Sequence, residues 1–472
     1  MAVLEGLRPT QALHYFEEIC AIPHGSRHTK AISDYLVRFA QAHGLACVQD
    51  ESNNVIIRKP ASKGYEAHPT VILQGHMDMV CEKDADCDID MRKDGLRLRH
   101  DGKYIYAEGT TLGGDDGIAV AYALAVLASD ELRHPPLEAV FTVDEEIGML
   151  GASALDMRLL KGRILLNCDS EDEGILTVSC AGGATSELTL PVAREASTAG
   201  EVWRMSVRKL TGGHSGVEIN KGRANANKVL TQILRQLPVR LISVDGGSKD
   251  NAIPRESTAL VVAQAPQAAF FAAADAVRKT LPSGETEAEF FCERAQSTLA
   301  PMTQASSDAV LGLLDAVPNG VQKMSGDIAG LVQTSLNLGI LTTEETRVTM
   351  TFSVRSSVNA EKAELIARLR ACAQEYGARY GESGAYPAWE YRKHSPLRDT
   401  MVEAYRELYG KEPVVEAIHA GLECGIFSDA LTGLDAVSFG PQMHDIHTSR
   451  ERLDIASTER TWNYLVRVLE KL

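Results

Sequence analysis

The sequence lacks the marks of a secreted or membrane-bound protein. Its first residues show no basic start followed by an apolar segment, so we expect no secretory signal. The longest apolar run, residues 117–128, is too short to span a bilayer. The nine cysteines are odd in number and include no Cys-x-x-Cys pair, which indicates free thiols in the reducing cytoplasm.

Positive charge is also scarce. The chain has 48 Lys and Arg residues against 64 Asp and Glu residues, a formal net charge of −16. Such an acidic chain repels nucleic acid and anionic membranes, so we predict that it binds neither. The acidity identifies no substrate, and solubility explains it most simply. With 472 residues, 44% of them hydrophobic, the chain is long enough for two or three domains.

Helical and strand patterns alternate in the first part of the chain and again in the last part. Between residues 12 and 169, short apolar runs such as 71–74 and 138–143 predict buried strands separated by helices. This order is typical of an α/β fold with a mostly parallel sheet and helices on both faces. We predict one such domain, built from residues 1–186 and 391–472.

The middle of the chain has a different character. Period-two alternation in runs such as 202–210 and 347–355 predicts strands with one solvent-exposed face, and residues 360–376 predict an amphipathic helix. Antiparallel sheets commonly have one exposed face. We therefore predict that residues 187–390 form an inserted α+β domain with an antiparallel sheet.

Histidine and acidic residues follow the predicted strands of the first domain. They are His76 and Asp78 after 71–74, Asp144-Glu145-Glu146 after 138–143, Asp169 after 163–167, and His444 and His447 after 436–439. A further acidic pair, Asp115-Asp116, lies in a glycine-rich run that opens a buried helix. Because carboxyl ends of parallel strands meet at one edge of a sheet, we expect these groups to converge.

Each of these residues alone has an ordinary explanation, such as a solvated acid, a core histidine or a helix cap. Together, five carboxylates and two imidazoles in one crevice require compensating positive charge. Two divalent cations supply it. Histidine and carboxylate ligands without thiolates suit zinc, with cobalt or manganese as alternatives, better than calcium.

The motifs also carry a family resemblance. They are Gly75-His76-Met77-Asp78, Thr111-Leu112-Gly113-Gly114-Asp115-Asp116-Gly117, Thr142-Val143-Asp144-Glu145-Glu146-Ile147-Gly148, Cys168-Asp169 and His447-Thr448-Ser449-Arg450-Glu451. In this order they resemble the co-catalytic metallopeptidases that include aminoacylase, carboxypeptidase G and carnosinase. The chain is most similar to the branch that cleaves aminoacyl-histidine dipeptides. The resemblance covers nearly the whole chain and implies hydrolysis of an amide bond in a small peptide.

The resemblance implies a set of metal ligands. Asp115 would bridge two metal ions. His76 and Asp169 would complete one site, and Glu146 and His447 the other. His444 is an alternative to His447. We prefer His447 because it is followed by a small residue and then by an acid, as in the family.

The resemblance also implies a general base. Glu145 would take a proton from the attacking water, and Asp78 would hold the far ring nitrogen of His76. Glu145 and Glu146 are adjacent, so on a regular strand they point in opposite directions. Both can serve the site only if the backbone has left the strand.

The inserted domain resembles the lid of the family. His214, in Gly213-His214-Ser215-Gly216, would donate to the oxyanion, and Arg355 would grip the substrate carboxylate. Without the family, the first would be an ordinary turn histidine and the second a surface ion-pair residue. Asn251, Gly421 and Glu423 fall in further substrate-binding motifs.

We therefore expect a cytoplasmic dipeptidase with two divalent metal ions per chain, acting on Xaa-His dipeptides that include β-alanyl-histidine. The alternatives are another amide hydrolase of the family (an aminoacylase, a broad dipeptidase or a tripeptidase), a non-catalytic metal-binding scaffold, and a two-metal phosphoesterase. The large inserted domain lets His214 act within its own chain, and a homodimer remains open.

Overall fold

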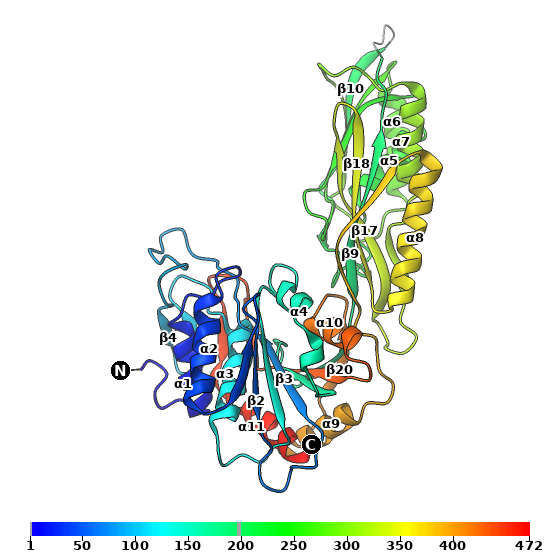
Figure 1. The fold of residues 1–472 in the computed structure, drawn as a ribbon. Coiled ribbons are helices and arrows are strands. Elements are labelled where there is room, and N and C mark those ends of the chain that lie inside the picture. The colour runs from blue at the N-terminus through cyan, green and yellow to red at the C-terminus, as the bar shows by residue number, and fades with distance from the viewer. Residues whose placement is uncertain (1, 196–199) are drawn as a thin grey trace. The chain divides into compact units, whose positions relative to one another are not determined.

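The computed structural model describes residues 2–195 and 200–472, which form two compact units (Figure 1). The α/β unit comprises the chain up to Cys180 together with Tyr391–Ala417 and Leu422–Leu472. The inserted unit comprises Ala181–Glu390 and the four residues Ile418–Gly421. The inserted unit begins six residues earlier than predicted, because strand β9 (Gly182–Pro191) pairs along its whole length with strand β18 (Arg347–Ser356) of that unit.

The α/β unit is built on an eight-stranded sheet in the order β1-β2-β6-β3-β7-β21-β8-β20. The strands are β1 (Ala46–Gln49), β2 (Val55–Lys59), β3 (Val71–His76), β6 (Leu137–Thr142), β7 (Ile164–Asn167), β8 (Ile175–Cys180), β20 (Val414–Ile418) and β21 (Asp435–Ser438). The neighbours among β6, β3, β7 and β21 are parallel. β2 and β8 join them antiparallel. The predicted α/β class is confirmed, and its parallel part is the centre of the sheet.

Helices cover both faces of this sheet. One core contains α1 (Thr10–Cys20), α2 (Lys30–Ala42), α3 (Gly114–Ala128), α9 (Pro396–Tyr409) and α11 (Ile455–Lys471). Alternate strand residues such as Leu73 and Phe141 belong to that core, whereas their buried neighbours Ile72 and Val140 do not. On the other face, α10 (Glu423–Ala430) contacts β8, β21 and α4 (Leu150–Ala154).

The central strands end together. His76, the last residue of β3, is paired with Thr142, the last residue of β6. Asn167 ends β7 and is paired with both Gln74 and Ser438. The segments that follow these strands therefore leave from one edge of the sheet.

A second, four-stranded sheet in this unit has the order β22-β23-β5-β4. It consists of β4 (Leu98–His100), β5 (Tyr104–Ala107), β22 (Met443–His444) and β23 (Arg452–Asp454). A short 3-10 helix, η1 (Met157–Leu159), precedes β7. The small sheet holds both ends of the His447 loop.

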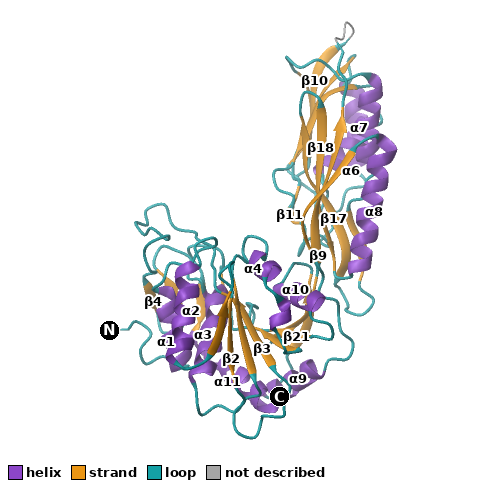
Figure 2. Cartoon of the chain, in the orientation of Figure 1, coloured by secondary structure: helices purple, strands orange, loops and turns teal. Residues whose placement is uncertain are grey.

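The inserted unit contains a nine-stranded antiparallel sheet with the order β15-β10-β14-β12-β17-β18-β9-β19 and β16 paired with β17. Its other strands are β10 (Glu201–Arg208), β12 (Arg240–Gly246), β14 (Ser257–Ala263), β15 (Glu289–Arg294), β16 (Gly320–Met324), β17 (Val332–Thr343), β18 (Arg347–Ser356) and β19 (Arg379–Tyr386). The helices α5 (Ala226–Leu234), α6 (Gln267–Arg278), α7 (Gln304–Ala316) and α8 (Asn359–Tyr376) pack along it (Figure 2). A separate pair, β11 (Gly213–His214) and β13 (Ala252–Ile253), lies in the same unit. The predicted antiparallel α+β fold is confirmed.

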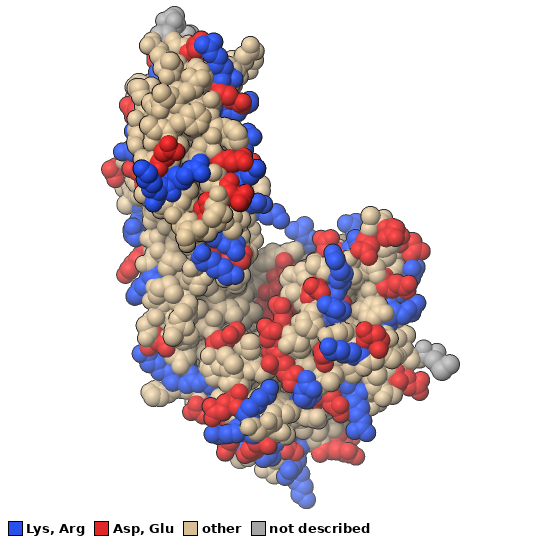
Figure 3. Space-filling view, turned by 180° about the vertical axis from the view of Figure 1, so that it is seen from behind, with Lys and Arg blue, Asp and Glu red and all other residues tan. Residues whose placement is uncertain are grey.

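The surface of both units is charged. Figure 3 shows acidic and basic side chains on each unit, interspersed with uncharged ones. None of the described helices combines the length and the apolar composition needed to cross a membrane.

Candidate functional site

The five predicted metal ligands come together at the edge where the central strands end. His76 Nε2 lies 3.1 Å from Asp115 Oδ1 and 3.8 Å from Asp169 Oδ1. His447 Nε2 lies 3.1 Å from Asp115 Oδ2 and 3.0 Å from Glu146 Oε1. The two carboxylate oxygens of Asp115 therefore face two different imidazoles. This is the arrangement that a bridging carboxylate requires.

Two overlapping groups of side chains could each hold a metal ion. One is His76 with Asp116 and Asp169, and the other is His76 with Asp115 and Glu146. Within each group the ligand atoms lie within 4.8 Å of one another. Asp116 was not predicted as a ligand. Its Oδ2 accepts a hydrogen bond from the backbone N–H of His76 at 3.2 Å, and the peptide bond that joins it to Asp115 is cis.

The cluster has excess negative charge. Among the described residues, no Lys or Arg forms an ion pair with Asp115, Glu146 or Asp169. Burial, reinforced by the charge of Asp116, raises the pKa of Asp169 well above its usual range. Hydrogen bonds to Asp115 and then to Glu146 raise the pKa of His447 to about 10. Divalent cations fit this donor set of imidazole nitrogens and carboxylate oxygens, and their charge would offset its repulsion.

Glu145 can serve the same site as Glu146 because the chain has left the strand. β6 ends at Thr142, and Asp144 has a left-handed backbone with φ 55°. The alternation of a regular strand therefore does not apply to the two glutamates. Burial raises the pKa of the Glu145 carboxyl to about 8, with a contribution from neighbouring carboxylates.

Asp78 connects the histidine ligand to Glu145. Its backbone carbonyl lies 3.0 Å from His76 Nδ1, while its Oδ1 is 3.5 Å from the same nitrogen. The carboxylate accepts hydrogen bonds from the backbone N–H of Glu145 at 3.0 Å and from Ser26 Oγ at 2.8 Å. Asp78 thus orients the ring partly through its main chain and also holds the backbone of Glu145.

Glu451 has a role that sequence analysis missed. Its carboxylate accepts hydrogen bonds from three successive backbone N–H groups, those of Leu112, Gly113 and Gly114, at 2.8, 3.1 and 2.7 Å. Gly113 has φ 68°, and a Cβ there would lie 2.9 Å from Met79 Sδ. Glu451 therefore fixes the turn that presents Asp115. The signal was available, because this acid ends the motif that begins at His447.

The structure also distinguishes the two candidate histidines. His444 lies in β22, and its ring packs edge-on against Tyr104 with the ring centroids 5.6 Å apart. His447 lies in the loop beyond β22 with φ 59° and contacts Asp115 and Glu146. His447 is therefore the histidine that joins the cluster.

The sequence is similar to those of known proteins. Residues 72–471 match the family described as Peptidase family M20/M25/M40. Over its full length the chain is 37% identical to the cytosol non-specific dipeptidase of Escherichia coli (strain K12), of which it covers 99%. The chain belongs to the M20 peptidase family. The predicted family resemblance is confirmed, and the protein is a peptidase, a hydrolase of peptide bonds.

Solved structures agree with this assignment. The aminoacylhistidine dipeptidase of Vibrio alginolyticus has a TM-score of 0.94 and 38% identity, with 99% of this chain and 98% of that chain covered. An aminopeptidase from Bacillus cereus has a TM-score of 0.58 at 15% identity, with 98% of each chain covered, which shows a shared fold alone.

The inserted unit of this M20 peptidase carries the predicted lid residues. His214 lies in β11, Asn251 directly before β13, and Arg355 near the end of β18. His214 Nδ1 accepts hydrogen bonds from the backbone N–H groups of Gly216 at 3.1 Å and Val217 at 3.3 Å. Burial and then the charge of Arg355 lower the pKa of His214. The two amide contacts are those of a neutral imidazole that accepts at Nδ1 and donates from Nε2.

A second histidine, His419, lies in the four-residue segment that also contains Gly421. It is 5% exposed, and its Nε2 lies 2.7 Å from Ser335 Oγ. Ser335 is the cross-strand partner of Arg355. Burial and then Arg355 lower the pKa of His419 to about 3. Sequence analysis missed His419, because nothing in its local pattern shows that this segment packs with the inserted unit.

Glu423 and Gly421 were predicted to line the substrate pocket. Glu423 is completely buried in the α/β unit, and Gly421 belongs to the inserted unit. Its Oε2 accepts hydrogen bonds from Gln74 Nε2 at 2.5 Å and Thr142 Oγ1 at 2.6 Å. Glu423 therefore links α10 to β3 and β6, close to where these strands lead into the predicted metal ligands.

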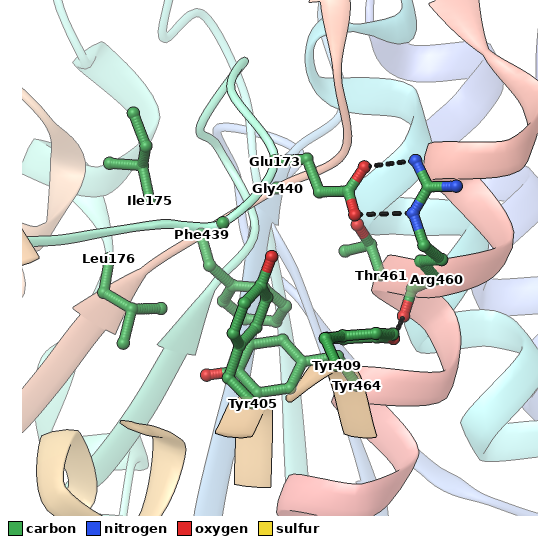
Figure 4. Close-up of a pocket in the computed structure, with 11 residues that line it drawn as sticks. Glu173, Ile175, Leu176, Tyr405, Tyr409, Phe439, Gly440, Arg460, Thr461 and Tyr464 are labelled. Carbon is green, nitrogen blue, oxygen red and sulfur yellow. Dashed lines mark hydrogen bonds and ion pairs between the residues drawn. The ribbon is translucent and has the colours of Figure 1, made fainter. Parts of the chain in front are cut away.

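A small cavity elsewhere in the α/β unit does not suit a peptide. Its volume is about 10 Å³, and tyrosine rings, Phe439 and a Glu173–Arg460 ion pair surround it (Figure 4). A space of that size holds about one water molecule. A far larger cavity, of about 700 Å³, includes Glu146 in its wall.

Proposed function

We propose that this M20 peptidase is a dipeptidase with two divalent metal ions, and that zinc is its metal. The position of Asp115 between His76 and His447 carries the proposal. His76 and Asp169 would hold one ion, Glu146 and His447 the other, and Asp115 both. Bound ions would supply a Lewis acid for the substrate carbonyl and lower the pKa of water.

Glu145 would act as the general base. It would accept a proton from the attacking water and deliver it to the amine that leaves. This role requires the carboxylate form. Bound cations would favour that form, because their positive charge lowers the pKa of a nearby carboxyl group.

His214 would stabilise the oxyanion. An oxyanion needs a hydrogen-bond donor, and the two amide contacts at Nδ1 leave the Nε2 proton of His214 for that purpose. A neutral imidazole donates from Nε2 only while Nδ1 remains an acceptor. The Gly216 and Val217 amides therefore favour the tautomer of His214 that carries its proton on Nε2.

Arg355 would bind the C-terminal carboxylate of the substrate. Its Nε is buried, and no hydrogen-bond partner for it occurs in the described part of the chain. A guanidinium with free donors suits a carboxylate, which it can bind through two parallel hydrogen bonds. Asn251 and Gly421 would contribute further polar contacts in the same unit. Recognition of a free carboxylate accounts for a preference for short peptides.

For the substrate we propose dipeptides, with Xaa-His and β-alanyl-histidine preferred. The similar proteins differ here, since one is named a non-specific dipeptidase and the other an aminoacylhistidine dipeptidase. The alternative is another amide hydrolase of the family, such as a broad dipeptidase, a tripeptidase or an aminoacylase. We propose that this protein acts in the cytoplasm. The name of the Escherichia coli relative places that relative in the cytosol.

A substrate panel tests the proposal. The purified protein is assayed on Xaa-His and Xaa-Leu dipeptides, β-alanyl-histidine, a tripeptide and N-acetylated amino acids. We expect dipeptides to be cleaved fastest, with Xaa-His first among them, and no cleavage after chelation until zinc is restored. Faster cleavage of N-acetylated amino acids than of every dipeptide would contradict the dipeptidase assignment.

A further inference from the structure

The large cavity of the α/β unit adjoins the metal-ligand cluster. Its volume of about 700 Å³ is within the range of small-molecule binding sites. Glu146 lines it and also lies 3.0 Å from His447 Nε2. Ser26, another lining residue, donates its hydroxyl proton to Asp78. The cavity and the proposed reaction centre therefore share side chains within one unit.

The cavity offers an apolar surface beside a polar rim. Met79, Val80, Ile89, Met91 and Ile147 line it. Met79 and Ile89 are buried, whereas Ile147 is 38% exposed, a high value for a large aliphatic side chain. When a ligand covers exposed apolar surface next to a reaction centre, that surface leaves water and the complex is stabilised.

Three charged side chains of the rim have partners within the protein. Lys83 donates to the carbonyl oxygens of Cys87 and Ile89 at 3.3 and 2.8 Å. Asp88 pairs with Arg97 at 2.7 Å, and Asp90 pairs with Lys93 at 3.1 Å. Each of these charges is satisfied by the protein itself. The apolar part of the lining is suited to an uncharged side chain of a ligand.

The chemistry of a dipeptide decides which of its groups can enter this cavity. In a dipeptide of α-amino acids, unlike β-alanyl-histidine, the reacting carbonyl carbon is bonded directly to the α-carbon that carries the N-terminal side chain. The side chain of that residue must therefore lie next to the reaction centre. The C-terminal side chain is farther away, beyond the amide nitrogen.

We propose that this cavity is the subsite for the side chain of the N-terminal residue, and that it favours large apolar side chains such as those of Leu, Met and Phe. The inference rests on the proposed dipeptidase function. Burial of a leucine side chain favours Leu over Gly by roughly tenfold or more.

Substitutions of Met91 test the subsite, because this half-buried residue lies in the cavity wall away from the proposed ligands. Met91→Trp should lower kcat/KM for Leu-His at least tenfold more than for Gly-His, since the indole fills the space. Met91→Ala enlarges the cavity, so it should raise kcat/KM for dipeptides with the largest N-terminal residues, such as Phe-His, relative to Gly-His. Leu408→Trp, on the exposed surface of α9, is the matched control and should leave the ratio unchanged.

Direct binding separates this inference from the proposed function. Binding of free L-leucine relative to glycine, followed by saturation-transfer NMR, should weaken in Met91→Trp and not in Leu408→Trp. If no dipeptide is cleaved by the unaltered protein, the proposed function fails, while the leucine measurement still decides the subsite. The subsite proposal is wrong if Met91→Trp changes neither the ratio of kcat/KM for Leu-His to that for Gly-His nor the affinity for free leucine.

Discussion

Each unit contains a cluster of polar side chains, and the two clusters differ in charge. In the α/β unit, buried carboxylates crowd around His76 and His447, and no Lys or Arg of the described chain pairs with the proposed ligands. In the inserted unit, one guanidinium, Arg355, lies near two histidines whose pKa values are lowered. The first cluster therefore suits cations and proton transfer. The second suits an anionic group of a substrate.

This contrast predicts that substitutions in the two units act on different steps. Changes in the α/β unit should remove the chemical step or the metal. Changes in the inserted unit should weaken oxyanion stabilisation or substrate binding while metal stays bound. The predictions below run from the largest expected effect to the smallest.

Glu145→Gln should have the largest effect. The amide cannot accept the proton from water, so kcat should fall by roughly 10²–10⁴-fold. Metal content, measured by plasma mass spectrometry, should stay at the level of the unaltered protein. Turnover within tenfold of normal would remove Glu145 from the role of base.

His214→Ala should lower kcat by about 10²–10³-fold, the usual cost of losing one oxyanion donor. KM and metal content should change little, because the residue belongs to the inserted unit. Stopped assays on Ala-His at saturating substrate measure the effect. Ser215→Ala serves as a neighbouring control, and an equal loss in both variants would point to a damaged turn.

Arg355→Lys should act on substrate binding. Lysine keeps the charge but cannot form two parallel hydrogen bonds, so KM should rise roughly tenfold with a smaller change in kcat. A dipeptide amide, which lacks the carboxylate, should lose nothing further in the variant. A KM equal to that of the unaltered protein would show that the carboxylate binds elsewhere.

Glu423→Gln should affect stability more than activity. Burial raises the pKa of Glu423 from 4.5 to about 7, so the folded protein binds an extra proton between these pH values. Stability should therefore fall as pH rises from about 4.5 to about 7, by on the order of 3 kcal/mol for this group. Glutamine should remove that loss. Urea unfolding of the chelated protein at pH 5 and pH 8, with the exposed Glu403→Gln as control, measures the difference.

Much of the α/β unit could be predicted, because short stretches of its sequence show where strands and helices lie and which polar residues stand beside them. Apolar runs such as 71–74 coincide with buried strands, and each predicted ligand follows a strand or opens a helix. The parallel register then brings these residues to one edge. The antiparallel outer strands were not predictable, because buried strands read alike in either direction.

The inserted unit was less predictable because its cluster depends on distant segments. His419 is 84 residues from Ser335 along the chain, and its segment interrupts the α/β unit in sequence. Asn225 shows the same limit on a small scale. Its side chain caps α5, so one hydrogen-bonding residue, and not the periodicity of apolar residues, fixes the start of the helix at Ala226. The contacts of Glu423 with Gln74 and Thr142 were not predicted, because a buried polar contact leaves no local pattern.

Metal titration tests the central claim most directly. The chelated protein is titrated with zinc in a calorimeter, alongside His447→Ala and the matched variant His444→Ala. We predict two zinc ions per chain for the unaltered protein and for His444→Ala, with dipeptidase activity returning as they bind, and at least one ion fewer for His447→Ala. Equal metal stoichiometry in all three proteins, or full activity in the chelated protein, would contradict the account.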